Sequence, residues 1–349
     1  MKTLLLFCAF FALTAVVQAQ SVIVVQNDTS MHTHHSLNEA VAAASDGDYI
    51  YIPGGTFSVN SLNIDKRLNI IGAGHNSQAT QATGVTILNG SISFATGSDN
   101  SMIQGLYVTN DINLTGYNGG MISNIFISRC NMDRLSFGPS FSWGSNDNSE
   151  NVLIKECVIR TQTDVANNSN HNVFENCILG STVHNIEGGV QFANCIFLKE
   201  NGTVLSTTNS GAFVNCVFHV RYRADLVFSN GNQPSLFQNC LFGCASLANQ
   251  TAQDNFFFNC YAFNGDVKLL YESVSTELYN DEHQYRFAWN DTLQAGALDF
   301  SQLGIYGGLD PYKDGAIPMN PHVESIYVPS QTDGQGRLTI QVNVQAQDR

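Results

Sequence analysis

Residues 172–180, NVFENCILG, contain a short motif that recurs along the chain. Its centre is an asparagine, a cysteine and an apolar residue, and later copies read GVQFANCIFL, GAFVNCVFHV, SLFQNCLFG and NFFFNCYAF. Looser copies, NIFISRCNM and NVLIKECVI, precede it. The cysteines that mark the repeat are Cys130, Cys157, Cys177, Cys195, Cys216, Cys240 and Cys260. They are separated by 27, 20, 18, 21, 24 and 20 residues. A period in this range is typical of a solenoid, in which each repeat buries its apolar face against the next.

Within one repeat the side chains alternate as in a β-strand, with a single interruption. If Phe174 points inward, Glu175 points outward, because successive strand side chains face opposite sides. Asn176 breaks this alternation, since Cys177 and Leu179 are apolar and share one parity. We expect a one-residue bend there, because asparagine tolerates left-handed backbone geometry. We also expect the amides of the repeated asparagines to bond to one another as a ladder over the rungs. These are Asn176, Asn194, Asn215, Asn239 and Asn259.

The alternation by twos excludes a helical repeat, which needs a period of 3.6 residues. The chain resembles the right-handed parallel β-helix proteins of the pectate-lyase-like superfamily, in its Asn-Cys rungs and in its N-terminal passage SLNEAVAAASDGDYIYIPGGTFSVNSLNIDKRLNIIGAG. Within that passage Ser36 and Glu39 predict a capping box that begins a helix. Such a helix would cover the open end of the solenoid. The resemblance spans roughly residues 21–274 and implies a fold but no single activity, because the superfamily includes lyases, hydrolases, esterases and adhesins.

The predicted fold class is all-β, a right-handed parallel β-helix solenoid with an N-terminal capping helix and a C-terminal cap. Residues 1–19 read as a secretory signal, with Lys2, an apolar run and a small-residue cleavage site before Gln20. Residues 20–45 should form a strand and the capping helix, and residues 46–275 about ten rungs of β-helix. Residues 276–349 should form a cap with short strands, and a docking or sorting tail is the alternative. We therefore expect a secreted, periplasmic or cell-surface protein.

Composition limits the partners. The formal net charge is −14 and only 13% of residues are charged, which argues against nucleic acid or an anionic membrane as partner. No second apolar run is long enough for membrane insertion. The sequence predicts a monomer, without cofactor and without a metal site, since no Cys/His cluster or stack of carboxylates has suitable spacing.

The cysteines allow two interpretations. Many cysteines in an exported chain normally indicate disulfides. The seven repeat cysteines, however, share one phase and would point inward along one column, and parallel side chains in register suit the disulfide torsion poorly. We therefore favour a stack of free thiols, which pack as small apolar residues.

Outward positions three, five and seven after each cysteine predict one polar face. Its candidate glycan-binding residues are Arg160, Asp164, His184, Glu200, His219, Arg221 and Arg223. Arginine suits the carboxylates of uronic acids, so the face predicts a protein that binds or acts on an acidic polysaccharide. Catalytic residues stay unknown. An enzyme of this kind would be a polysaccharide lyase or a glycoside hydrolase. In the alternative, Glu200 pairs with Arg221 across one rung and the chain is a structural or surface-interaction solenoid.

Overall fold

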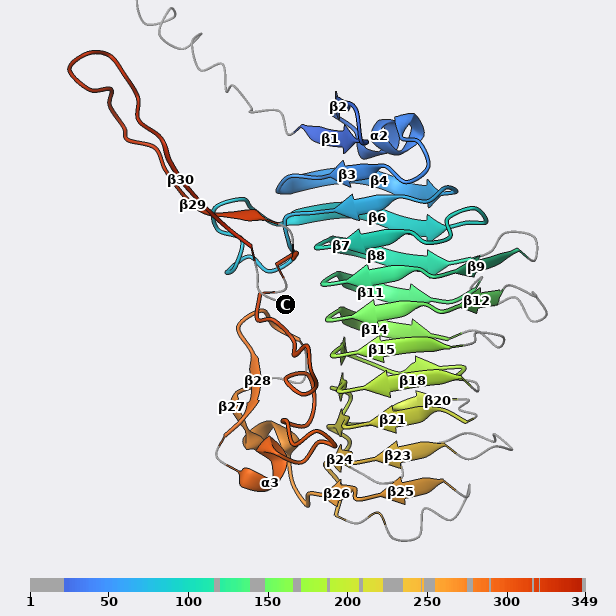
Figure 1. Ribbon diagram of the computed structural model, residues 1–349. Coiled ribbons are helices and arrows are strands. Elements are labelled where there is room, and N and C mark those ends of the chain that lie inside the picture. Colours follow the sequence, from blue (N-terminus) through green and yellow to red (C-terminus); the bar gives the residue numbers. More distant parts are fainter. Residues whose placement is uncertain are drawn as a thin grey trace, which may run out of the picture.

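Two long sheets of mainly parallel strands run through the molecule (Figure 1). The computed structural model describes residues 22–115, 120–138, 148–165, 171–186, 189–206, 210–221, 235–245, 247, 255–274, 279–288, 290–315, 317–319 and 321–346. The predicted signal, residues 1–19, lies outside them. Sheet 1 has 12 strands, of which the following ten are parallel: β3 (Tyr49–Tyr51), β5 (Asn69–Ile71), β7 (Met102–Gln104), β10 (Phe126–Ser128), β13 (Leu153–Lys155), β15 (Asn172–Glu175), β18 (Val190–Ala193), β21 (Ala212–Val214), β23 (Leu236–Gln238) and β25 (Phe256–Phe258).

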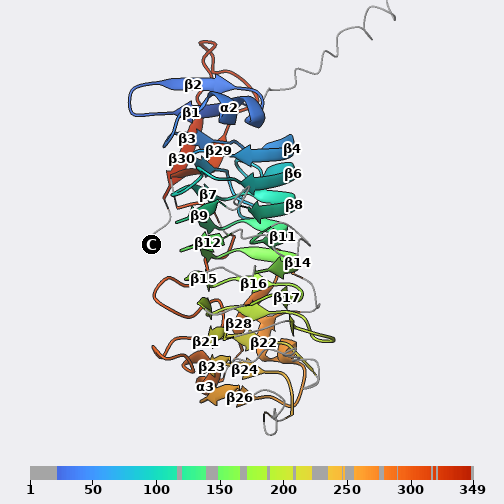
Figure 2. The ribbon, with the colours of Figure 1, turned by 90° about the vertical axis from the view of Figure 1, so that its right-hand side faces the viewer.

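Sheet 2 lies beside sheet 1, and its strands follow those of sheet 1 in each rung (Figure 2). Its main path consists of β4 (Gly55–Ile64), β6 (Thr86–Phe94), β8 (Tyr107–Leu114), β11 (Asn131–Ser136), β14 (Val158–Asp164), β16 (Ile178–Leu179), β19 (Ile196–Phe197), β22 (Val217–Phe218), β24 (Leu241–Phe242) and β26 (Tyr261–Ala262). Two further strands, β17 (Val183–His184) and β20 (Leu205–Ser206), join its edge. A short parallel pair is formed by β9 (Met121–Ser123) and β12 (Asn148–Glu150). The all-β parallel solenoid is therefore confirmed.

The bend before each repeat cysteine is confirmed as a single left-handed residue. Asn176, Asn194, Asn215, Asn239 and Asn259 have φ values of 52°, 53°, 55°, 53° and 50°. The two looser copies place Arg129 and Glu156 there, at φ values of 50° and 51°. One such residue turns the chain between the two sheets, so that the cysteine after it points into the core.

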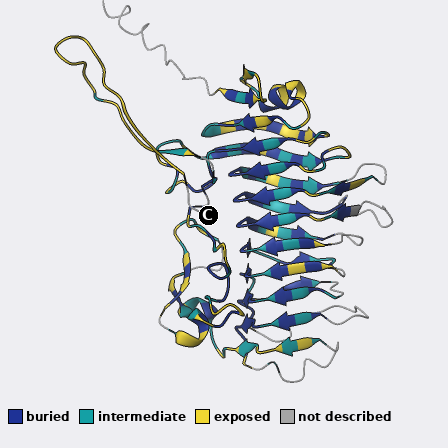
Figure 3. Cartoon of the chain, in the orientation of Figure 1, coloured by how far each residue is buried: buried dark blue, intermediate teal, exposed yellow. Residues whose placement is uncertain are grey.

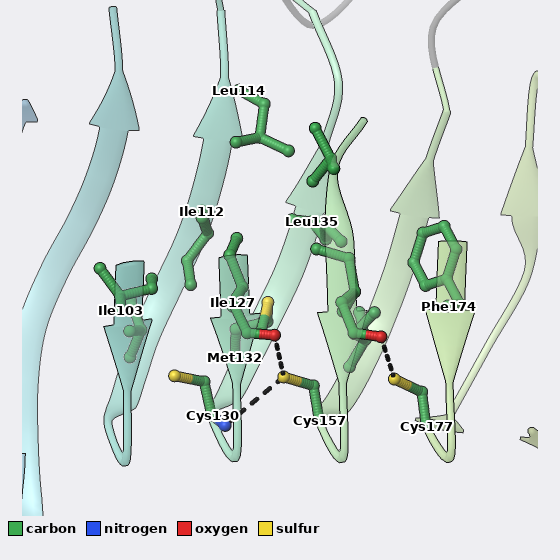
Figure 4. Packing of buried hydrophobic residues seen from close by; sticks show 14 of the residues in the cluster. Ile103, Ile112, Leu114, Ile127, Cys130, Met132, Leu135, Cys157, Phe174 and Cys177 are labelled. Carbon is green, nitrogen blue, oxygen red and sulfur yellow. Dashed lines mark hydrogen bonds between the residues drawn. The ribbon is translucent and has the colours of Figure 1, made fainter. Parts of the chain in front are cut away.

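The cysteines and phenylalanines form columns through the core. All the repeat cysteines are free, and all except the half-buried Cys260 are buried. Each thiol from Cys157 onward contacts a carbonyl oxygen of the preceding rung. Cys157 Sγ lies 3.6 Å from the Ile127 oxygen, and Cys177 Sγ lies 3.3 Å from that of Ile154 (Figure 4). Phenylalanines of sheet 1 stack on one another as a second column, with centroid separations of 4.5–5.1 Å. These are Phe174, Phe192, Phe213, Phe237 and Phe257.

The N-terminal elements lie at one end of the stack (Figures 1 and 2). β1 (Ile23–Gln26) pairs antiparallel with β2 (Met31–His34) and with β3, and the helix α2 (Leu37–Ala43) buries Leu37, Ala40 and Val41. Ser36 is its N-cap residue, but its side chain makes no capping hydrogen bond, so the predicted capping box is wrong. At the other end of the helix, Lys66 Nζ donates to the carbonyl oxygens of Val41 and Ala44.

The C-terminal part returns along the side of the stack (Figure 1). It contains the 3₁₀ helix η3 (Val267–Leu270), β27 (Tyr271–Ser273), β28 (Gln284–Phe287), α3 (Asp291–Gln294), and the hairpin of β29 (His322–Tyr327) and β30 (Gln341–Gln345). A second apolar core joins this part to the outer face of sheet 2. The residues that sheet 2 contributes are Val158, Ile178, Ile196, Val217 and Leu241.

Three of the repeated asparagines, Asn176, Asn215 and Asn239, bond to this returning segment, so the predicted ladder of amides is wrong. Asn176 Nδ2 donates to the carbonyl oxygens of Ile305 and Gly307, at 2.7 and 2.8 Å. Asn239 Nδ2 donates to the Gly296 oxygen at 3.1 Å. The side chains point away from the core because the residue before the cysteine lies at the outside of the bend. The described residues 296–315 and 317–318, which we call the strap, cover the asparagines from Asn176 to Asn239, whereas Asn259 is exposed.

Candidate functional site

The register of sheet 2 separates the candidate residues into three groups. Asp164 lies opposite His184, as the spacing from the cysteines predicts. On the following rung His184 pairs with Ser206. Counting seven positions from Cys195 predicts Gly202 at this place, so the rung that follows Cys195 is longer than that count assumes. The candidates therefore do not form one continuous face. They divide into Arg160, the pair Asp164 and His184, and the group Glu200, His219 and Arg221, and each of these has different neighbours.

Arg160 is used in holding neighbouring rungs together. Its guanidinium donates from Nη1 to Asn131 Oδ1 at 2.5 Å, and from Nη2 to the carbonyl oxygens of Val108 and Thr109 at 3.2 and 3.1 Å. It also lies over the Tyr107 ring, 4.7 Å from the centroid. Most of its hydrogen-bonding capacity therefore serves the protein itself.

Asp164 and His184 form a partly exposed polar group at the edge of sheet 2. Asn185 Nδ2 donates to Asp164 Oδ1 at 2.7 Å. Burial lowers the pKa of His184, and Lys199 acts in the same direction, while the Asp164 carboxylate opposes them. Lys199 Nζ in turn donates to Thr182 Oγ1 at 2.7 Å. A neutral and partly exposed imidazole beside a carboxylate could accept a proton.

Glu200 lies at the centre of an ion cluster formed by Glu200, Arg221, Asp266 and Lys268. Its side chain is 1% exposed, and Oε2 lies 2.6 Å from Arg221 Nη2. Its other oxygen, Oε1, pairs with Lys268 Nζ. Asp266 Oδ2 lies 3.2 Å from Arg221 Nη2 and 3.6 Å from Lys268 Nζ. The pairing of Glu200 with Arg221 across one rung is therefore confirmed. Two cations and two anions balance within the cluster.

His219 does not face outward, so the prediction that it lies on an exposed polar face is wrong. The side chain is buried beneath β27, and Nε2 lies 3.1 Å from Tyr271 Oη. Burial lowers the pKa of His219 to about 3, Lys268 acts in the same direction, and Asp266 opposes them. The returning C-terminal part covers His219. The alternation of inward and outward side chains along a strand does not indicate whether another segment covers the outward side. The remaining candidate, Arg223, lies outside the described residues.

Sequence reasoning missed the partners that close this site. Asp266, Lys268 and Tyr271 belong to the segment after the last repeat cysteine, where the period that aligned the rungs has ended. It also missed a buried ion pair. Arg129 and Glu156, at the bend position of the looser repeats, pair at 3.1 Å and are 1% and 2% exposed. Two successive repeats carry oppositely charged residues, Arg129 and Glu156, where the later repeats carry asparagine. This replacement could have indicated the ion pair.

In the part of the chain that the structure describes, no group of three or more His, Cys, Asp or Glu residues is arranged to hold a metal ion. None of the described helices is long and apolar enough to cross a membrane. Comparison with protein-family models, with curated proteins and with solved structures finds no match.

Proposed function

We propose that this chain is an exported, non-catalytic β-solenoid that serves as a rigid scaffold for surface interactions. The observation that carries the proposal is that most of the described candidate residues of the polar face are already paired or buried within the protein. Glu200 is buried between two cations, and Arg160 is bonded to carbonyl oxygens of neighbouring rungs. His219 is enclosed under Tyr271. A general acid or base has to reach the substrate, and a buried group that is already paired cannot do so without local opening.

The shape of the molecule supports the same proposal. Ten stacked rungs, of which the last seven share a column of thiols and the last five a column of stacked rings in sheet 1, make a stiff body, because each rung contacts its neighbours along its length. We further propose that the stack is right-handed and related to the pectate-lyase-like superfamily, on the strength of its Asn-Cys bends and N-terminal passage.

An acidic polysaccharide is the second candidate partner. The side chain of Arg221 is 40% exposed although it pairs with Glu200. His184 and Lys199 are partly exposed on nearby rungs. Together they could offer cationic or hydrogen-bonding contacts to the carboxylates of a uronic-acid polymer, without any proton transfer.

A test of catalysis uses pectin-, alginate- and glycosaminoglycan-type polymers. Incubation with the protein should produce neither the ultraviolet absorbance of unsaturated uronides nor new reducing ends. Either product, lost in the His184→Gln variant, would overturn the non-catalytic proposal.

A test of binding uses the same polymers with three variants. If the polysaccharide is a partner, Arg221→Ala should weaken binding by more than about 1 kcal/mol, which exceeds the contribution of an exposed ion pair. Arg221→Lys should retain part of the affinity, and added salt should weaken binding. Arg286→Ala, which removes a half-exposed arginine paired with Asp314, is the matched control and should have no effect. Absence of binding by the unmutated chain would end this candidate.

A further inference from the structure

The described part of the chain contains three asparagine–glycine pairs: Asn89 with Gly90, Asn201 with Gly202, and Asn264 with Gly265. Asparagine is chemically labile, and such a pair can lose ammonia without an enzyme. The glycine backbone nitrogen attacks the side-chain carbonyl carbon, the bond to the amide nitrogen breaks, and that nitrogen leaves as ammonia with the proton of the glycine N–H. Water then opens the resulting five-membered succinimide ring to aspartate or isoaspartate. Glycine favours the attack because it has no side chain to obstruct it.

The fold determines which of the three pairs can react. The glycine nitrogen has to be free of a hydrogen bond, and the backbone has to move it towards the asparagine side chain. A hydrogen-bonded segment of a sheet allows this only when it opens locally. Most residues of the two sheets are buried or half-buried (Figure 3), so a reactive pair is expected in a turn.

The pair Asn89 and Gly90 is protected. It lies inside β6, which has β4 and β8 as its neighbours in sheet 2. The Gly90 nitrogen donates to Thr109 Oγ1 at 3.0 Å, and the same hydroxyl donates to Asn89 Oδ1 at 3.3 Å. Thr109 therefore holds both of the groups that would have to react with each other.

The pair Asn264 and Gly265 is partly protected. It lies in the turn between β26 and η3, and the Asn264 side chain is exposed. The Gly265 nitrogen donates to the carbonyl oxygen of Phe263 at 2.9 Å. This bond has to break before the nitrogen can attack.

The pair Asn201 and Gly202 has no such protection. Both residues are exposed, and they lie in the turn between β19 and β20, outside the strands. The Gly202 nitrogen donates no hydrogen bond to a residue that the structure describes. Gly202 has a φ of 74°, and the space where a Cβ would lie is open except for Lys199 Cε at 3.6 Å. Neither hydrogen bonding nor crowding therefore hinders the attack here.

We propose that Asn201 is a site of spontaneous deamidation in the folded chain, converting to aspartate and isoaspartate while Asn89 is retained. The new carboxylate lies on the turn that carries Glu200 and follows Lys199, so the surface beside the ion cluster gains a negative charge as the protein ages. Isoaspartate also lengthens the backbone of this turn by one methylene group. The inference does not rest on the proposed function.

Peptide mass mapping of the chain from Gln20 onward, incubated in its folded state, tests the inference. Asn201 should convert at least about tenfold faster than Asn89, because conversion of Asn89 requires local opening of β6. The conversion of Asn201 should be faster at pH 8 than at pH 6, since the glycine nitrogen attacks after it loses its proton. Asn201→Gln, whose longer side chain disfavours ring closure, should remove most of the isoaspartate that a methyltransferase assay detects. Circular dichroism should show the same β-rich fold for this variant.

Incubation in denaturant provides the matched control. Without the folded structure Asn89, Asn201 and Asn264 should convert at similar rates, because each is followed by glycine. The difference between the folded and the denatured chain then measures the protection that the fold gives each pair.

Two results would overturn the inference. The first is an Asn201 amide that survives in the folded chain for as long as the denatured chain takes to lose it. The second is conversion of Asn89 or Asn264 as fast as that of Asn201 in the folded chain, since the fold would then not select the site.

Discussion

At the residue scale, the position before each repeat cysteine serves two purposes. It turns the backbone by adopting a positive φ, and in five of the seven repeats its side chain bonds to the strap. Asparagine meets both needs, because it accepts the left-handed conformation and carries an amide that can donate to carbonyl oxygens. The cysteine after it is small and weakly polar, which suits the crowded start of a buried strand.

We expect Asn176→Ala to lower the free energy of unfolding by about 2–3 kcal/mol. It removes the donor to the carbonyl oxygens of Ile305 and Gly307, and it places a residue with a Cβ at φ 52° without asparagine's tolerance for that region. Asn176→Gly removes only the amide, so it should cost about 1 kcal/mol less. Denaturant unfolding measures both. Equal stability of all three chains would show that the strap contact contributes nothing.

His219 should make the fold sensitive to acid. Its pKa lies near 3 in the folded chain and near its ordinary value of 6.5 when unfolded. As pH falls from about 6.5 towards 3, the unfolded state takes up a proton that the folded state does not bind, so stability is full above this window and is lost within it. His75, whose pKa burial lowers to about 4, adds to the same loss.

Unfolding measured at pH 7 and pH 4 should show this dependence. In His219→Gln the loss between the two values should be smaller by about 3 kcal/mol, since one unit of pKa shift corresponds to about 1.4 kcal/mol. The exposed His171 offers a control, and His171→Gln should leave the dependence unchanged. An identical pH profile for His219→Gln would contradict the assigned burial.

At the element scale, the strands of the later rungs are too short to be stable alone. β16, β19, β22, β24 and β26 contain two residues each. They are held by their neighbours, through backbone pairing and through columns of identical side chains. Phe197 and Phe218 stack at 4.3 Å, and Phe218 and Phe242 at 4.8 Å, so each ring is packed by the rungs on both sides. Such a solenoid is stabilised mainly by contacts between neighbours.

The thiol column gives a direct test at this scale. The eight cysteines from Cys130 to Cys260 are free. In the native chain, aromatic-disulfide reagents should react readily only with the half-buried Cys260, because the others are buried. In denaturant without reductant, all eight should react. Titration of only two thiols, which implies three disulfides, would contradict the column.

At the scale of the whole molecule, the strap joins rungs that are far apart in sequence. Ile317 accepts a hydrogen bond from Arg129 Nη1 across a separation of 188 residues, and the backbone of Lys313 donates to Glu156 Oε2 at 3.1 Å. Asp310 pairs with Lys155 at 3.0 Å. The strap and the elements before it thereby cover the outer apolar face of sheet 2, and this cover also closes the ion cluster around Glu200.

The buried pair of Arg129 and Glu156 should show strong coupling. Arg129→Asn or Glu156→Asn alone leaves one charge buried without its partner and should cost about 3–5 kcal/mol. The double variant restores the asparagine of the other repeats at both bends, so it should cost less than the sum of the two by at least about 1 kcal/mol. A double-mutant cycle in denaturant measures this difference, and strictly additive costs would contradict the paired geometry.

What the sequence alone determined was local. The spacing of the cysteines predicted the rungs, and the break of alternation at Asn176 predicted the left-handed bend, because strand geometry and backbone sterics act between adjacent residues. The pairing of Glu200 with Arg221 followed from the same period. Only the tertiary structure decided which way the Asn176 amide points, that Lys268 completes the ion cluster and that Tyr271 covers His219. These contacts join the repeats to a segment without a repeat, and no local period encodes where such a segment packs.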